Sequence, residues 1–434
     1  MPIPHPRLLR AAAVVVAAAA FALVPSPPRA EAQRAPATTL PLVVIDADGP
    51  IRDRPRVGGT MRIIHRGGGA LNRVTDPANV YNGRIRIEVR GKSSQRFPKQ
   101  QFALETVDAR GDNLNVPLLG MPRENDWVLY AAYNDATLLR NVVAYRAARQ
   151  MGGYAARTRI VELVLGGRYW GVYVLLETPK LDGDRVDSAV PGSDGYLLEV
   201  TQDSKLTPGE RFFRTPRSRV PVVYADPDGD DIRPEQARAL AARVGALDRA
   251  VAGRAFRHPT RGYRRHLDVP AAVDYALLNE FLRNHDAFRA STFLHEGTGG
   301  RLAMGPVWDF DLAMGFGSPD RSPRGCSLCN RLWVGRWYDD PAFVRAMVRR
   351  WAELRREGLV PRLIADLQRD AATLTPAQVR NLRRWRMLGA TPVPAGASDA
   401  ALRAAYRRET TRLVRWLRAR DAWMQANLPR IGRL

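Results

Sequence analysis

Cysteine is nearly absent from this sequence, because its 434 residues contain only Cys326 and Cys329, in the stretch CSLC. Two thiolates cannot fill the four-coordinate site of a structural zinc ion, so a cysteine-only zinc fold is excluded. We expect the two residues to form a local disulfide, and redox activity of the CxxC pair is the alternative. A disulfide that closes such a small loop adds little stability.

Lysine is scarce in a chain that is otherwise strongly basic. The sequence has 67 Lys and Arg and a formal net charge of +23, yet lysine occurs only at positions 92, 99, 180 and 205. Biased composition explains most of the arginine, but strong basicity still favours anionic partners, such as a nucleotide or an anionic envelope polymer. Lysine offers a compact ammonium that a guanidinium cannot imitate. Lys92 and Lys99 share one short stretch, 90–99, which marks it as a candidate site.

Long hydrophobic runs are missing after residue 24. Arg7 and Arg10 precede the apolar run 11–24, and an A-x-A site ends at Ala32, a pattern typical of a secretory signal peptide over residues 1–32. The run is too short for a comfortable membrane span, and no later window has 18 uninterrupted apolar residues. We therefore expect cleavage near Ala32, a secreted or cell-envelope (periplasmic) protein, and no membrane span in the mature chain.

The remaining chain is longer than one compact core usually holds, which predicts more than one structural unit. An Ala/Pro/Thr linker is expected at 33–41. Residues 42–180 alternate between apolar and polar residues in short runs, which predicts a sheet-rich unit with one helix at 135–151. Residues 181–434 are mainly of helical period, with helices expected at 233–252, 271–284, 341–369, 375–387 and 398–427. The fold class is therefore α+β, with an antiparallel sheet followed by a helical part and a cleft between them.

The stretch GPVWDFDLAMGFG, residues 305–317, places Asp309 and Asp311 among apolar side chains. Buried carboxylates are costly unless a cation or hydrogen-bond donors pair with them, although an Asp in a β-turn or at a helix cap is the alternative. Asp286 follows the helix expected at 271–284, and the hairpin expected within 284–317 would bring it back to Asp309. Phosphoryl transfer needs such a pair, one to orient the attacking hydroxyl and one to hold Mg²⁺.

Five further stretches occur in a recognisable order between about residue 84 and residue 317. They are RGKSS with FPKQQFAL, YNDATLLRNVVAYRAARQMG, YWGVYVLLETPKLDGDRV, DGYLLEV, and NEFLRNHDAFRASTFL followed by GPVWDFDLAMG. In these motifs the chain resembles the CotH family of atypical, spore-coat-type protein kinases. The resemblance implies a bilobal, protein-kinase-like fold that uses ATP and Mg²⁺, with lobes at 42–180 and 181–434.

The resemblance also implies roles for individual residues. Asp286 would be the catalytic aspartate and Asp309 the metal ligand. The nucleotide would be bound at the phosphates and near the adenine by Arg90, Gly91, Ser93, Ser94, Lys99 and Glu177.

The sequence departs from the kinase pattern at two places. Ser291 stands where related kinases tend to offer Asn as a second metal ligand, and a serine hydroxyl binds metal more weakly. Asp311 is a substitute ligand, or else it hydrogen-bonds its own turn. The helix at 135–151 offers no Glu to pair with a lysine, and we expect Arg140 on that helix to be structural, bonded to carboxylates near the cleft.

The leading hypothesis is a secreted ATP- and Mg²⁺-dependent kinase that transfers the γ-phosphoryl group to Ser or Thr of exported or envelope proteins. The alternative is a non-catalytic surface or coat protein, a pseudokinase that uses the same fold for binding. No specific nucleic acid is expected as a partner. The arginine-rich end, 398–434, is expected to cover the helical part through an apolar stripe made of Leu402, Tyr406, Leu413, Leu417 and Trp423.

Overall fold

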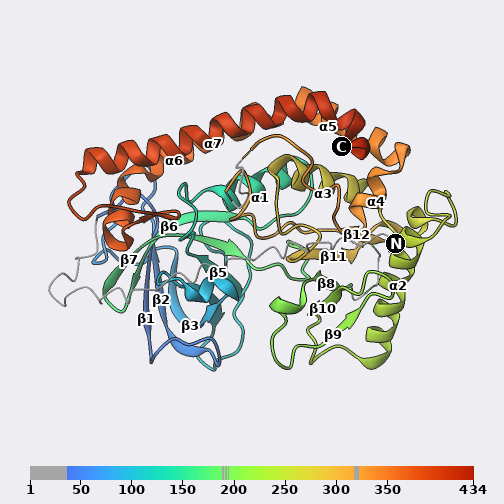
Figure 1. The fold of residues 1–434 in the computed structure, drawn as a ribbon. Coiled ribbons are helices and arrows are strands. Elements are labelled where there is room, and N and C mark those ends of the chain that lie inside the picture. The colour runs from blue at the N-terminus through green and yellow to red at the C-terminus, as the bar shows by residue number, and fades with distance from the viewer. Residues whose placement is uncertain (1–36, 188–189, 191–192, 194, 317–321) are drawn as a thin grey trace, which may run out of the picture.

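The structure is a computed structural model that describes residues 37–187, 190, 193, 195–316 and 322–434. The expected signal peptide lies outside the described residues. Seven strands form a closed barrel in the order β1-β2-β3-β4-β5-β7-β6 (Figure 1). Their bounds are β1 Leu42–Ala47, β2 Val57–Ile64, β3 Tyr81–Arg90, β4 Gln101–Val107, β5 Asp126–Tyr130, β6 Thr158–Leu165 and β7 Arg168–Glu177.

The barrel closes through a parallel pair, β1 with β6, in which Leu42 lies opposite Glu162 and Ile45 opposite Leu165. All its other neighbouring strands are antiparallel, as the sequence led us to expect of this sheet, and the seam between β1 and β6 is the exception. The barrel has seven strands, an odd number, so six antiparallel pairings leave β1 and β6 running in the same direction. Closing the barrel between them makes a parallel pair and leaves no sheet edge to solvent. Alternate side chains of the strands fill the interior, among them Ile45, Ile85, Ile87, Phe102, Trp127, Leu129 and Leu163.

The expected linker at 33–41 is in part a piece of the barrel wall. Thr38 exchanges two backbone hydrogen bonds with Asn72, and the N–H of Glu162 donates to Pro41 at 3.0 Å. Thr38 is buried as well. The Ala/Pro/Thr composition misled the prediction here, because these contacts come from residues far along the chain.

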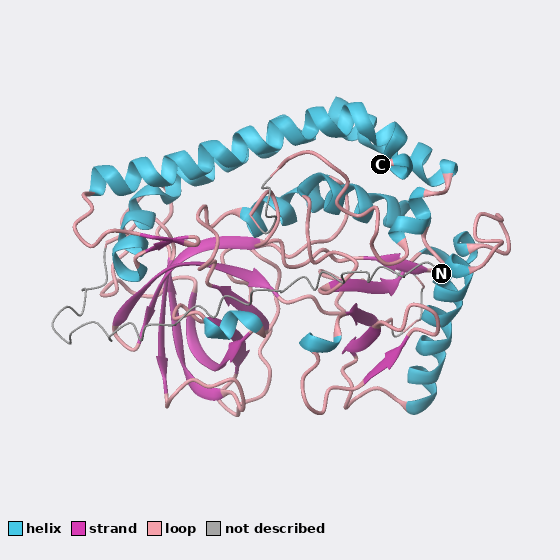
Figure 2. Cartoon of the chain, viewed as in Figure 1, coloured by secondary structure: helices cyan, strands magenta, loops and turns pink. Residues whose placement is uncertain are grey.

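A second sheet lies beside the barrel, with strands in the order β12-β11-β8-β10-β9 (Figure 2). Their bounds are β8 Leu197–Val200, β9 Phe212–Arg214, β10 Pro221–Asp226, β11 Thr292–Glu296 and β12 Leu302–Met304. β8, which lies in the DGYLLEV motif, is the centre of this sheet, and the expected hairpin at 284–317 supplies β11 and β12. The part after residue 180 is thus less purely helical than its sequence pattern suggested.

The helices are α1 Arg140–Gln150, α2 Pro234–Ala252, α3 Val269–Leu282, α4 Val334–Tyr338, α5 Pro341–Arg356, α6 Leu359–Trp385 and α7 Asp399–Asn427. In place of the expected helices 341–369 and 375–387, the structure has α5 and α6. The break falls at Gly358, whose φ of 78° suits a residue without a Cβ. Pro376 lies inside α6, because burial of Leu374, Ala377 and Leu382 around it outweighs the lost backbone hydrogen bond.

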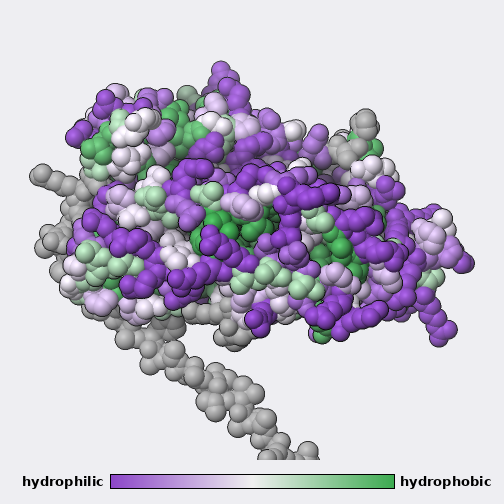
Figure 3. All heavy atoms as spheres, turned by 90° about the horizontal axis from the view of Figure 1, so that it is seen from above, coloured by the Kyte–Doolittle hydropathy of each residue, from purple (hydrophilic) through white to green (hydrophobic). Residues whose placement is uncertain are grey.

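The long helices α6 and α7 run across both sheets (Figure 1). α6 reaches the barrel, where Arg380 bonds Glu162 at 2.6 Å. α7 buries the apolar stripe expected from its sequence, with Trp423 half-buried, so it covers the core as expected. Its outer side carries exposed arginines, and the face seen from above is mostly hydrophilic (Figure 3).

α7 is fixed to α3 by an ion pair that is wholly buried. Arg420 and Glu280 have side chains with 0% exposure and approach to 2.6 Å. Cys326 and Cys329 form the disulfide that the sequence predicted. Within that loop, the N–H groups of Ser327 and Leu328 donate to the Glu280 carboxylate.

We expect Arg420→Met to destabilise the protein by roughly 3–5 kcal/mol, because the Glu280 carboxylate would stay buried without its cation. Urea unfolding would measure the loss, and adding Glu280→Gln should recover part of it. Arg415→Met, at an exposed position of the same helix, is the matched control and should shift stability by less than about 0.5 kcal/mol. Equal effects of the two substitutions would contradict a special role for the pair.

Candidate functional site

The segment that carries Asp309 is attached to helix α1. The N–H of Asp309 donates to the Tyr145 hydroxyl at 3.2 Å, and the N–H of Phe310 donates to Asn141 Oδ1 at 2.7 Å. Asn141 and Tyr145 lie four residues apart, so both face the same side of α1. Trp308 stacks on the Tyr145 ring with centroids 5.6 Å apart. Helix α1 therefore fixes the position of Asp309.

Several residues around Asp309 have left-handed backbone conformations. The φ angles of Ser291, Phe288 and Asp309 are 50°, 58° and 60°. Arg283 and Met314 adopt the same region. Each such conformation costs a non-glycine residue free energy, and costs of this kind gather at functional sites. This concentration on the two segments that carry Asp286 and Asp309 singles them out.

Asp286 is placed by the end of helix α3. Arg283 ends the helix in a left-handed conformation, and Asn284 Oδ1 then accepts the N–H of Asp286 at 3.2 Å. The Asp286 carboxylate is 3.3 Å from Nζ of Lys205. Lys205 belongs to the loop between β8 and β9, so the second sheet supplies the cation that faces this aspartate.

Three aspartates share one region of strong negative charge. Burial raises the pKa of Asp309, and the charge of Asp286 raises it further, while Lys205 and Arg90 act against the shift. The pKa of Asp311 is raised well above its usual value by burial and then by Asp309. Asp311 is hydrogen-bonded to Asp309, and it also accepts from Asn134 at 2.9 Å. The hairpin therefore does bring Asp286 and Asp309 within electrostatic reach of each other.

The end of β3 lies on the other side of Asp309. The guanidinium of Arg90 is 5.7 Å from the centroid of the Trp308 ring, and burial lowers its pKa while Asp309 raises it. Gly91 has φ +99°, and a Cβ there would collide with Ser94 Oγ. Only glycine fits this tight turn, which leads into the short 3₁₀ helix that contains Ser93 and Ser94. Arg90 thus lies within electrostatic reach of Asp309, and its role in phosphate binding stays a prediction.

The structure contradicts two of the expected nucleotide contacts. Lys99 is 1% exposed, and its Nζ donates to the carbonyls of Ala131 and Val172 and to Asn381 Oδ1. All three N–H donors are therefore used within the protein. Glu177 is also fully buried, and its carboxylate accepts from Arg157 and Tyr154. Both side chains hold the fold together, and the sequence pattern did not show these distant partners.

Sequence reasoning also missed two charged residues at the site, Glu199 and Lys205. Ser291, the expected second metal ligand, donates its N–H to Glu199 Oε1 at 3.2 Å. Burial raises the pKa of Glu199, and the charge of Lys92 partly offsets this shift. The second missed residue is Lys205. The scarcity of lysine in this sequence could have identified Lys205, because the argument that singled out Lys92 applies to it equally.

The donor set fits a magnesium ion that takes its other ligands from phosphate and water. Among the described residues, no group of three or more His, Cys, Asp and Glu could hold a metal. Mg²⁺ commonly uses one or two carboxylates together with substrate phosphates rather than an all-protein cage. Asp309, with Asp311 bonded to it, offers carboxylate oxygens whose pKa values are raised first by burial and then by the neighbouring carboxylates.

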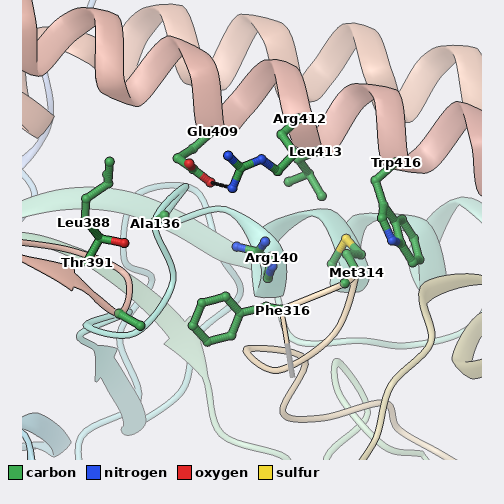
Figure 4. A pocket seen from close by; sticks show the side chains of 12 residues that line it. Ala136, Arg140, Met314, Phe316, Leu388, Thr391, Glu409, Arg412, Leu413 and Trp416 are labelled. Carbon is green, nitrogen blue, oxygen red and sulfur yellow. Dashed lines mark hydrogen bonds and ion pairs between the residues drawn. The ribbon is translucent and has the colours of Figure 1, made fainter. Parts of the chain in front are cut away.

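A pocket lies under α7, between that helix and the chain that follows Asp311 (Figure 4). Met314 and Phe316 line it together with Arg140 and Trp416, and none of the site residues expected from sequence does. Arg140 is structural, as expected, because it pairs with the buried Asp135 and donates from Nε to the Ala313 carbonyl at 3.1 Å. The pocket is therefore separate from the carboxylate cluster.

A family model described as CotH kinase protein matches residues 87–424. The comparison with curated proteins finds no match. Among solved structures, a chain of the Shewanella oneidensis MR-1 toxin–antitoxin complex of HipA, HipB and operator DNA is 16% identical, with a TM-score of 0.27. That alignment covers 74% of this chain and 66% of the other, and so low a score carries no functional argument. Among the described residues, no helix is sufficiently long and apolar to cross a membrane.

We expect Asp311→Asn to stabilise the metal-free protein at neutral pH. Because folding raises the pKa of Asp311, its ionisation opposes folding, and this penalty grows as pH rises from the unfolded pKa, about 4, through the folded one. Thermal melts in EDTA should therefore coincide near pH 4 and separate toward pH 8, with the variant higher. An equal or lower melting temperature of the variant at pH 8 would contradict the raised pKa.

Proposed function

The chain belongs to the CotH kinase family, and we propose that it transfers the γ-phosphoryl group of ATP to Ser or Thr of exported or envelope proteins. One observation carries the proposal: Asp286, Asp309, Arg90 and Lys205 come from four separate segments and converge on one another. A catalytic carboxylate, a metal-binding carboxylate and two cations are the groups that phosphoryl transfer requires.

In this proposal Asp286 orients the acceptor hydroxyl and takes its proton. Arg90 and the backbone of the Gly91–Ser94 turn bind phosphate oxygens. Asp309, with Asp311 bonded to it, holds Mg²⁺, which when bound neutralises charge on the nucleotide phosphates. The barrel would be the first lobe of a protein-kinase-like fold and the part after residue 180 the second, with the nucleotide between them.

The proposal includes export after removal of residues 1–32, which the sequence pattern supports. The exposed arginines of α7 would then meet an anionic envelope polymer, since like charges gathered on one helix attract polyanions. These arginines are Arg403, Arg407, Arg408, Arg412, Arg415 and Arg418.

A non-catalytic role is the second candidate, and Ser291 favours it. Ser291 stands where related kinases tend to offer Asn as the second metal ligand, so only a hydroxyl is present at that position. Its N–H donates to the Glu199 carboxylate. A protein with this site could bind nucleotide and still fail to transfer phosphate.

Two substitutions would decide between these functions. With γ-labelled ATP and Mg²⁺, the parent should label itself or an added protein, and Asp309→Asn should lose both nucleotide binding and transfer. Asp286→Asn should still bind nucleotide, while transfer falls by about 10²- to 10⁴-fold, the scale for loss of a positioned base. Binding without any transfer by the parent would support the non-catalytic role. Absence of both nucleotide binding and transfer would reject the kinase function.

A further inference from the structure

Lys205 occupies the centre of the charged cluster. Its ammonium is 3.3 Å from Asp286, and its charge also lowers the pKa values of Asp309 and Glu199. Among the described residues Asp286 is its one ion-pair partner, and its side chain keeps 23% exposure. Thus an ammonium that water can reach contacts Asp286 and lies within electrostatic reach of Asp309 and Glu199.

The other three lysines have different surroundings. Lys99 is enclosed by three oxygen atoms. Lys180 pairs with Asp126 at 2.9 Å and with Glu124 at 3.4 Å. Lys92 donates to the Lys205 carbonyl and lies 3.6 Å from Glu210. Lys92 therefore holds the backbone that positions Lys205, and Lys205 itself contacts Asp286 while part of its side chain stays exposed.

We propose that Lys205 binds the γ-phosphoryl group of the nucleotide and stabilises it during transfer. This inference rests on the proposed kinase function. The acceptor hydroxyl must lie within hydrogen-bonding distance of Asp286, and the phosphorus that it attacks must be adjacent. A cation that touches Asp286 is therefore also next to the transferred group.

The transfer needs no reactant other than ATP and the acceptor hydroxyl. The acceptor oxygen forms a bond to the γ-phosphorus, and the bond from that phosphorus to the β–γ bridging oxygen breaks. ADP leaves with the electron pair, and the hydroxyl proton passes to Asp286. The charge of the Lys205 ammonium is opposite to that carried by the γ-phosphoryl oxygens, where electrostatic stabilisation acts most strongly. A compact ammonium suits this confined position between carboxylates better than a planar guanidinium.

The proposal predicts that Lys205 discriminates ATP from ADP, since only ATP carries the γ-phosphate. We would titrate the full-length parent and Lys205→Met with the non-hydrolysable β,γ-imido analogue of ATP and with ADP, each with Mg²⁺. The substitution should weaken binding of the ATP analogue by about 10- to 100-fold, the change expected when a hydrogen bond to a charged group is lost. ADP binding should change by less than about threefold. Lys205→Arg should recover part of the loss, because the charge remains.

Lys180→Met is the matched control, since it removes another half-buried lysine that pairs with an aspartate. It should leave the ratio of the two affinities unchanged, and thermal melts would show that each variant is folded. An unchanged ratio in Lys205→Met, with both nucleotides bound by the parent, overturns the role of Lys205 and leaves the kinase function standing. If the parent binds neither nucleotide, the kinase function fails and this inference fails with it.

Discussion

Repulsion between carboxylates is the constraint on which this site depends. Asp286, Asp309, Asp311 and Glu199 lie together, and burial and mutual repulsion raise the pKa of Asp309 and of Asp311. The fold keeps them in place with cations from both sheets, Arg90 from the barrel and Lys205 from the second sheet. The free-energy cost of holding such charges is offset by burial of the continuous hydrophobic core that α1, α3 and the long helices share.

Local sequence signals predicted those features that depend on neighbouring residues. The barrel strands, α1, α7 and the disulfide follow from alternation, helical period and spacing. The turn at Gly91 and the return of Asp309 toward Asp286 could also be predicted, since a tight turn and a hairpin are short-range structures.

Features that depend on distant partners could not be predicted. The parallel seam between β1 and β6 requires strands more than 100 residues apart in sequence to meet. Lys99 was assigned to phosphate because it is a rare lysine near a glycine turn, yet Asn381 of α6 takes part in enclosing it. The same reasoning applied to Lys205 would have identified a residue of the site. Scarcity of a residue type thus indicates a special environment, and only the tertiary contacts decide which environment it is.

The order of the elements along the chain has a consequence for how this protein is made. Asp286, Asp309 and Asp311 precede residue 312, as do Arg90 and Lys205, the two cations assigned to the site. The helices that hold them follow later: α6 bonds the barrel through Arg380, and α7 bonds α3 through Arg420. A growing polypeptide therefore contains these groups before it contains α6 and α7, the helices that bond the barrel and α3.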